Sequence, residues 1–375
     1  MGSDTIVSAP GRICLFGEHQ DFLGLSVIAC PIDLTITLTC RPRDDRHLAV
    51  HFPDLAGSPR DLIHADRLAE YRHNRDYVRS ATNVLRREGL HIKQGYDCTV
   101  HGTIPINAGT SSSSALVVAW TAFLLSTQNG DLPHDRVDIA RFAHKAEVVE
   151  FDEPGGMMDH YASAVGGLLY IDCCEPITVT HLPAQLDGFV LGDTGVPKNT
   201  TGTLRGSRDD TRAGLEILKR HIAGFDLRQT PLVEAEQYFS LMPANVRKRV
   251  RANFINRDLC QEARRMLSEP TVADPAKLGA MLHEHQVQLR DGIGVSHPRL
   301  DELIDAAMEA GALGGKLNGS GCGGCMYAYA PGRQQEVKEA IDRAGGRGFI
   351  VSVSNGVEVD EGSVPGASAQ PSAGG

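Results

Sequence analysis

Four consecutive serines, residues 111–114, are the stretch of this sequence best suited to chemistry. They follow a loop of small residues, 105–110, and precede residues 115–125, which are almost wholly apolar and predict a buried helix. The serines would then lie at a helix N-terminus, where free backbone N–H groups and the helix dipole favour an anion. Small side chains let a polyphosphate approach the main chain, and serine hydroxyls can ligate Mg²⁺. We interpret the stretch as a phosphate-binding loop, although no lysine follows the glycine as in a P-loop.

Two further segments, residues 9–24 and 314–325, combine glycine with unusual polar side chains. In the first, a short apolar strand leads into a Gly-flanked loop that crowds Glu18, His19 and Asp21 into one turn. The second contains several glycines and the pair Cys322 and Cys325. That pair resembles half of a zinc or redox site, but no second pair accompanies it, so we expect no metal there.

The elements that must position these side chains have clear patterns in the first half of the chain. Apolar and polar residues alternate over 32–40, which predicts a half-buried strand, and residues 96–103, 166–172 and 188–193 also have strand patterns. Helical spacing predicts a helix over 135–150 with Glu147 near its end. Residues 153–156 break that helix, and the next helix would begin with Asp159 in its first turn.

The second half is mainly helical in pattern. Helices are predicted at about 207–222, 231–240, 244–267, 276–291 and 298–310, with strands near 313–317 and 325–330. A helical run after a strand-rich half predicts an α+β fold with two domains, residues 1–195 and 196–355, and a cleft between them. Residues 356–375 are rich in Gly, Ser, Ala and Pro, and we predict a disordered tail.

Composition narrows the class of ligand. The chain of 375 residues has 37 basic and 47 acidic side chains and no long Lys or Arg run, so we expect no nucleic-acid partner. No signal peptide pattern and no apolar run of membrane-spanning length is evident, and the nine cysteines do not form a disulfide framework. We therefore expect a cytoplasmic protein without a membrane contact, a monomer or a homodimer, that binds small molecules.

The three segments together resemble the motifs of the GHMP kinases, the superfamily of galactokinase, homoserine kinase, mevalonate kinase and phosphomevalonate kinase. Residues 11–22, GRICLFGEHQDF, are similar to the galactokinase sugar loop G-R-x-N-L-I-G-E-H-x-D-Y. Further agreement comes from residues 145–147, 156–160, 295–301 and 314–321, which follow in the family's order. Cys14 and Gln20 depart from the Asn and Thr of galactokinases, and residues 193–212 match poorly, so the resemblance leaves the sugar open.

The resemblance implies a two-domain GHMP kinase fold with the active site between the domains, and transfer of a phosphoryl group from ATP to the anomeric hydroxyl of a monosaccharide. Asp159 would be the catalytic base and Arg12 would keep it ionised and neutralise charge on the phosphoryl group. Glu18, His19 and Asp21 would bind sugar hydroxyls, while Ser113 and Glu147 would hold Mg²⁺. The implied ATP-binding residues are Gly109, Ser111, Ser112, Ser113, Ser114, Gly319 and Gly321.

Three alternatives stay open. The acceptor could be a uronic acid held by Lys198 or Arg205, or a non-sugar alcohol similar to mevalonate or homoserine, although recognising a carboxylate requires a convergent Lys or Arg. The chain could also be a sensor that binds sugar and ATP without turnover, but the presence of Arg12, Ser113 and Asp159 favours an enzyme.

Overall fold

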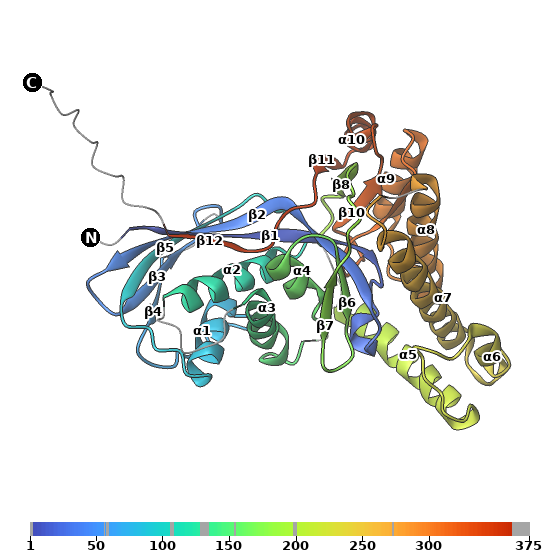
Figure 1. Ribbon diagram of the computed structural model, residues 1–375, viewed down its shortest axis with the longest axis horizontal. Coiled ribbons are helices and arrows are strands. Elements are labelled where there is room, and N and C mark those ends of the chain that lie inside the picture. The colour runs from blue at the N-terminus through green and yellow to red at the C-terminus, as the bar shows by residue number, and fades with distance from the viewer. Residues whose placement is uncertain are drawn as a thin grey trace, which may run out of the picture.

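The computed structural model describes residues 3–55, 57, 60–105, 109–127, 135–153, 155–197, 201–271 and 274–361. The first half of the molecule is a sheet that carries its helices on one face (Figure 1). The strands run in the order β12-β1-β2-β5-β3-β4, with β6 on β2 and β7 on β6. Their bounds are Thr5–Phe16 (β1), Val27–Arg43 (β2), His47–His51 (β3), Asp61–His64 (β4), Gly95–Gly102 (β5), Leu169–Asp172 (β6), Thr178–His181 (β7) and Glu358–Glu361 (β12).

Helix α2 (Ser112–Ser126) lies in the core of this half, as the apolar sequence predicts. A helix that is apolar on every side must be covered on every side, and α2 contacts β1 and the helices α1 (Tyr77–Arg87), α3 (Arg136–His144) and α4 (Met158–Val165). Trp120 and Phe123 are fully buried, and Trp120 Nε1 donates to Thr82 Oγ1 over 3.0 Å. This packing fixes the N-terminal turn of α2, where the serines lie.

The predicted helix over 135–150 is confirmed as α3 followed by a π-helical turn, Lys145–Val149. Asp135 caps it, because its Oδ1 accepts from the backbone N–H of Asp138 over 2.8 Å. Gly156, in the break before α4, lets Asp21 approach the backbone closely, since a Cβ at Gly156 would lie 1.6 Å from Asp21 Oδ2. Asp159 is in the first turn of α4, as predicted.

The second half is a four-stranded sheet covered by helices, in the order β11-β8-β10-β9. Its strands are Phe189–Asp193 (β8), Gly314–Leu317 (β9), Cys325–Tyr329 (β10) and Arg347–Val351 (β11). Its helices are α5 (Thr201–His221), α6 (Leu232–Glu236), α7 (Ala244–Leu267), α8 (Pro275–Val287), α9 (Pro298–Glu309) and α10 (Gln334–Arg343). Three short turns of helix complete the described elements: Asp21–Leu23, Phe239–Leu241 and Gln288–Ile293. Together the two halves form the predicted α+β fold.

An apolar cluster joins the two halves. Ile13, Phe16 and Ile28 of β1 and β2 pack in one buried cluster with Phe189 of β8 and Tyr327 of β10. The loop that follows β1 therefore lies beside the second sheet, because the strand before it is part of the shared core. No helix in the described ranges is both long and apolar enough to cross a membrane.

The topology differs from the predicted domain bounds at two places. Strand β8, which precedes the predicted boundary at residue 195, belongs to the second sheet, and strand β12 returns to the edge of the first sheet, where Glu358 pairs with Ser8 of β1 (Figure 1). The prediction of a disordered tail from residue 356 is therefore wrong for residues 358–361. Backbone pairing with a free sheet edge orders this segment, and it does not depend on the apolar side chains that composition measures. Residues 362–375 lie outside the described ranges.

Candidate active site

Arg12 and Asp159, the predicted catalytic pair, are in direct contact. Arg12 lies in β1, and its Nε is 2.7 Å from Asp159 Oδ1 on α4. The arginine side chain is buried, whereas 31% of the aspartate side chain is exposed. Arg12 Nη1 also donates to the carbonyl of Gly109 over 2.7 Å. The strand thus connects the Asp159 carboxylate to the loop ahead of α2.

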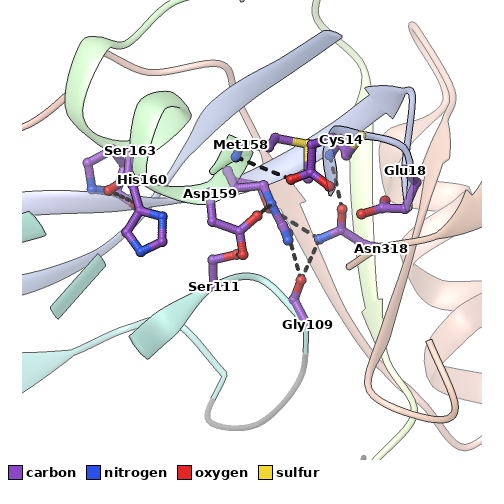
Figure 2. Close-up of polar contacts among 12 residues, drawn as sticks. Cys14, Glu18, Gly109, Ser111, Met158, Asp159, His160, Ser163 and Asn318 are labelled. Carbon is purple, nitrogen blue, oxygen red and sulfur yellow. Dashed lines mark hydrogen bonds and ion pairs between the residues drawn. The ribbon is translucent and has the colours of Figure 1, made fainter. Parts of the chain in front are cut away.

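The predicted phosphate loop supplies the second hydrogen bond to Asp159. Ser111 has a left-handed backbone (φ 60°), and its hydroxyl donates to Asp159 Oδ2 over 2.7 Å, as Figure 2 shows. Burial by itself would raise the pKa of Asp159, but the charge of Arg12 and the Ser111 hydrogen bond outweigh it and hold that pKa below its ordinary value. Asp159 is therefore ionised at neutral pH.

Asn318, for which the sequence suggested no role, connects all three motifs. Its Oδ1 accepts from the backbone N–H of Cys14 over 3.1 Å, and its Nδ2 donates to the carbonyls of Arg12 and Gly109 over 3.1 and 3.0 Å (Figure 2). The glycine that follows allows this close approach, since a Cβ at Gly319 would lie 2.6 Å from Gly109 O. The Gly-rich segment 314–325 thus holds the loop at 109–111 against β1.

Glu18 is buried and paired with Lys316, for which the sequence suggested no role. Lys316 Nζ lies 2.9 Å from Glu18 Oε2 and donates to the carbonyl of Cys14 over 2.8 Å. Lys316 is fully buried, and its ammonium lies 5.2 Å from the centre of the Tyr327 ring. The detectable signal was a charged residue inside the short apolar strand β9. This pair fixes the start of the loop that carries His19 and Asp21.

His19 and Asp21 are the two residues of this loop whose side chains can still form hydrogen bonds with a ligand. Within the described residues, His19 Nε2 is buried without a hydrogen-bond partner, and burial lowers the pKa of this histidine, so it is neutral near pH 7. Asp21 accepts from the backbone N–H groups of Phe22 and Met158 over 3.0 and 3.5 Å. Burial and the nearby charge of Asp159 raise the pKa of Asp21 to about 6. The negative charge of the ionised Asp21 carboxylate is therefore poorly stabilised by its surroundings.

These residues face one pocket. Arg12, Asp159, Glu18, His19 and Asp21 line it together with Gly319 of the third motif. Helices of the second half add side chains that sequence reasoning missed, because they come from segments with ordinary helical patterns. Those residues are Ser207, Arg208 and Thr211 of α5 and Asn253 of α7.

The predicted ATP-binding serines begin helix α2. Ser112 and Ser113 are partly exposed in its first turn, whereas Ser114 is buried. Both exposed serines line a second pocket, which is otherwise mostly apolar and is walled by Ile36, Phe52, Leu55, Tyr77, Val100, Ile104 and Leu116. An anion-binding helix end thus adjoins an apolar pocket. Of the predicted glycines, Gly321 packs against the Val295 carbonyl instead, where a Cβ would lie 2.2 Å from the oxygen.

The two predicted metal ligands come from neighbouring elements of the first half, since α2 contacts the π-helical turn that carries Glu147. Glu147 is buried, and its Oε2 lies 2.7 Å from His160 Nε2. His160 follows Asp159 on α4 but points away from the Asp159 cluster (Figure 2).

Among the described residues, Glu147 Oε1 and the Ser113 hydroxyl have no hydrogen-bond partner, so one carboxylate and one hydroxyl oxygen are available. No group of three or more His, Cys, Asp or Glu side chains in the described ranges could hold a metal ion. This donor set therefore fits Mg²⁺, which keeps several waters or substrate oxygens, better than a metal enclosed by protein ligands.

Of the two alternative residues for a carboxylate, only Arg205 lies in the described part of the chain, and it does not line the pocket. Lys198 lies outside the described residues, and Arg205 is exposed on α5. All nine cysteines lie in the described ranges, and none of them forms a disulfide.

Family models match three parts of the chain. "GHMP kinases N terminal domain" matches residues 76–167, and "GHMP kinases C terminal" matches residues 264–347. "Galactokinase galactose-binding signature" matches residues 1–42, which contain Arg12 and the loop at 18–21.

Relatives carry two kinds of name. A mevalonate kinase of Pyrococcus horikoshii is 32% identical over 368 residues, 95% of this chain and 98% of its own length. A galactokinase of Mannheimia succiniciproducens is 28% identical over 350 residues, 90% of this chain and 89% of its own length. Among solved structures, Lactococcus lactis galactokinase complexed with galactose has a TM-score of 0.83 at 21% identity and 95% coverage of both chains. A mevalonate kinase structure has a TM-score of 0.69 at 17% identity, covering 93% of this chain and 99% of its own.

Proposed function

This chain belongs to the GHMP kinase family, and we propose that it uses ATP to phosphorylate the anomeric hydroxyl of a monosaccharide. The observation that carries the proposal is a single pocket in which Asp159, held by Arg12 and Ser111, faces the same space as His19 and Asp21. Residues 18–22, which we call the acceptor loop, lie inside the segment that matches the galactose-binding signature, and this supports a sugar as the acceptor.

In the proposed reaction Asp159 takes the proton of the acceptor hydroxyl. The acceptor oxygen forms a bond to the γ-phosphorus of ATP while the bond from that phosphorus to the leaving oxygen of ADP breaks. Asp159 is ionised at neutral pH, as a base must be, and the anomeric hydroxyl is the most acidic hydroxyl of a sugar, so a carboxylate of modest basicity suffices. Arg12 keeps Asp159 oriented, and its positive charge stabilises the transferring phosphoryl group.

The nucleotide would occupy the pocket at the start of α2. Its apolar wall suits an adenine ring, and the backbone N–H groups of the first turn, with Ser112 and Ser113, suit the phosphates. Ser113 and Glu147 would hold Mg²⁺. When bound, the ion would neutralise phosphate charge during transfer.

Sugar hydroxyls need several polar partners in fixed positions. His19 Nε2 and the carboxylate of Asp21 have free capacity toward the pocket, whereas Glu18 acts through its ion pair with Lys316 by fixing the loop. The relatives named mevalonate kinase support a second candidate, a non-sugar alcohol as acceptor.

The test is a coupled ADP-release assay over a panel of aldoses, uronic acids and mevalonate, followed by phosphorus NMR of the product. We expect an acid-labile phosphate whose phosphorus couples to the anomeric proton. The methyl glycoside of the accepted sugar should bind without reacting. A phosphate on a primary carbon, or turnover of the methyl glycoside, would overturn the assignment to the anomeric oxygen.

A further inference from the structure

The pocket lined by Asp159, His19 and Asp21, which we call the acceptor pocket, also contains Arg208, an arginine without an ion pair to any described residue. It lies on α5 between Ser207 and Thr211, and these three residues share the helix face that lines the pocket. Its side chain is partly buried, and its Nε is inaccessible to solvent and makes no hydrogen bond with any described residue. The other arginine that lines the pocket, Arg12, is paired with Asp159.

The guanidinium of Arg208 is held in place by an aromatic ring of the acceptor loop. Its central carbon lies 5.1 Å from the centre of the Phe22 ring, and Phe22 follows Asp21. A stacked guanidinium has a defined plane, so its N–H donors can present a two-point contact before the ligand arrives. Burial and the neighbouring Arg212 lower the pKa of Arg208, but a guanidinium stays charged at every physiological pH. A partly desolvated cation without a partner is costly unless an anion binds it.

Asp21 lines the same pocket next to Phe22, and its charge, with those of Asp209 and Asp152, acts on Arg208 from beyond ion-pair distance. No ion pair joins them among the described residues, and the pKa of Asp21 is raised, which is the opposite of what a paired arginine produces. Both groups are therefore left to a ligand: Asp21 can accept from hydroxyls, and Arg208 can donate to an anion.

We infer that the acceptor is a sugar acid, a hexuronic acid, whose carboxylate binds the Arg208 guanidinium while its hydroxyls bind Asp21 and His19. The inference rests on the proposed function and names its substrate class. The reacting hydroxyl lies at Asp159, so the carboxylate is a group of the sugar remote from the reacting carbon. A sugar acid uses the cation and both hydroxyl acceptors, whereas a neutral hexose leaves the Arg208 charge unpaired. An alcohol similar to mevalonate offers fewer hydroxyls to His19 and Asp21.

The experiment compares wild type with Arg208→Gln, Arg208→Lys and, as a matched control, Arg220→Gln. Arg220 is an exposed arginine of the same helix that does not line the pocket, so its replacement removes the same charge elsewhere. Values of kcat and KM are measured for galacturonate, glucuronate, the two neutral hexoses galactose and glucose, mevalonate and ATP. Thermal unfolding of each variant establishes that it is folded.

We expect wild type to prefer a hexuronic acid to its neutral hexose. Arg208→Gln should lower kcat/KM for the acid about 10- to 100-fold, mainly through KM, because a charge-assisted hydrogen bond is lost. The neutral hexose, KM for ATP, and Arg220→Gln should change less than about threefold. Arg208→Lys should recover part of the loss, since it restores the charge without the planar fork.

Three results would overturn the inference. They are a wild-type preference for the neutral hexose, an equal loss for acid and hexose in Arg208→Gln, and a rise in KM for ATP alone, which would place Arg208 on the nucleotide. Turnover of mevalonate with no turnover of any sugar would overturn both the sugar acid and the proposed sugar 1-kinase. A wild-type preference for the neutral hexose, with the phosphate on its anomeric oxygen, would overturn only the sugar acid and leave the proposed function standing.

Discussion

Replacing Asp21 by Asn should make the protein more stable at neutral pH and less able to bind its acceptor. Burial and the charge of Asp159 raise the pKa of Asp21 from 3.8 to about 6 in the folded protein. A carboxyl with a raised pKa stabilises the fold only while it is protonated. That stability is complete below pH 3.8 and is lost as the pH rises through 6. The ionised Asp21 of the free enzyme is therefore a destabilising group at pH 7 to 8.

The magnitude follows from the pKa. A shift from 3.8 to about 6 corresponds to about 3 kcal/mol of folding free energy between acid and neutral pH. The side chain is partly exposed, so solvent screening reduces the expected value to about 2 kcal/mol. Asn keeps the size of the side chain, and its Oδ1 can still accept from the backbone N–H of Phe22. The amide nitrogen that replaces Oδ2 cannot accept from the backbone N–H of Met158.

The assay is urea unfolding of wild type and Asp21→Asn at several pH values from 4 to 8. The variant should gain about 2 kcal/mol relative to wild type between pH 4 and pH 8. Asp172→Asn is the matched control, for which we expect the opposite change in stability. Asp172 pairs with Arg228 over 2.5 Å, which lowers the pKa of Asp172, so this variant should be less stable than wild type throughout pH 5 to 8 and should approach it only as the pH falls below 3.8.

Calorimetric titration with the accepted sugar tests the predicted loss of acceptor binding. Sugar affinity should fall at least tenfold in Asp21→Asn, while ATP affinity stays within a few-fold. A stability difference between Asp21→Asn and wild type that does not vary with pH would refute the raised pKa. Unchanged sugar affinity would refute the role of Asp21 in the acceptor pocket.

Three further changes test other parts of the site. Asp159→Asn should lower kcat about 10²- to 10⁴-fold with both substrates still bound, and near wild-type turnover at saturation would leave Arg12 as the main source of catalysis. Ser113→Ala should raise the Mg²⁺ concentration needed for half-maximal rate without lowering the melting temperature, and an unchanged Mg²⁺ dependence would exclude the hydroxyl as a ligand. Lys316→Met should destabilise the fold by about 3 kcal/mol or more, because it leaves the Glu18 carboxylate buried and unpaired, and urea unfolding that matched wild type would contradict this.

The local patterns of the sequence were sufficient for the secondary structure around the site. The apolar run after Ser114 predicted the buried helix α2, and the helical spacing over 135–150 and the glycines at 155–156 predicted where α4 begins. These features depend on side-chain periodicity and backbone preferences, which each residue carries wherever it lies. The order of the three motifs along the chain also indicated the GHMP kinase family, and the models of that family match this chain.

Contacts between distant segments were decided only by the tertiary structure. Lys316 and Glu18 are 298 residues apart in the chain, and their pairing depends on β9 lying beside β1. Arg208 has the pattern of any exposed helical arginine, and only the packing of α5 against the acceptor loop brings it over Phe22, where no described residue forms an ion pair with it. Strand β12 was ordered by a free sheet edge that its own composition could not reveal. Sequence patterns report how a residue fits its own element, whereas charge compensation and edge pairing depend on which elements meet, and that is determined by the whole chain.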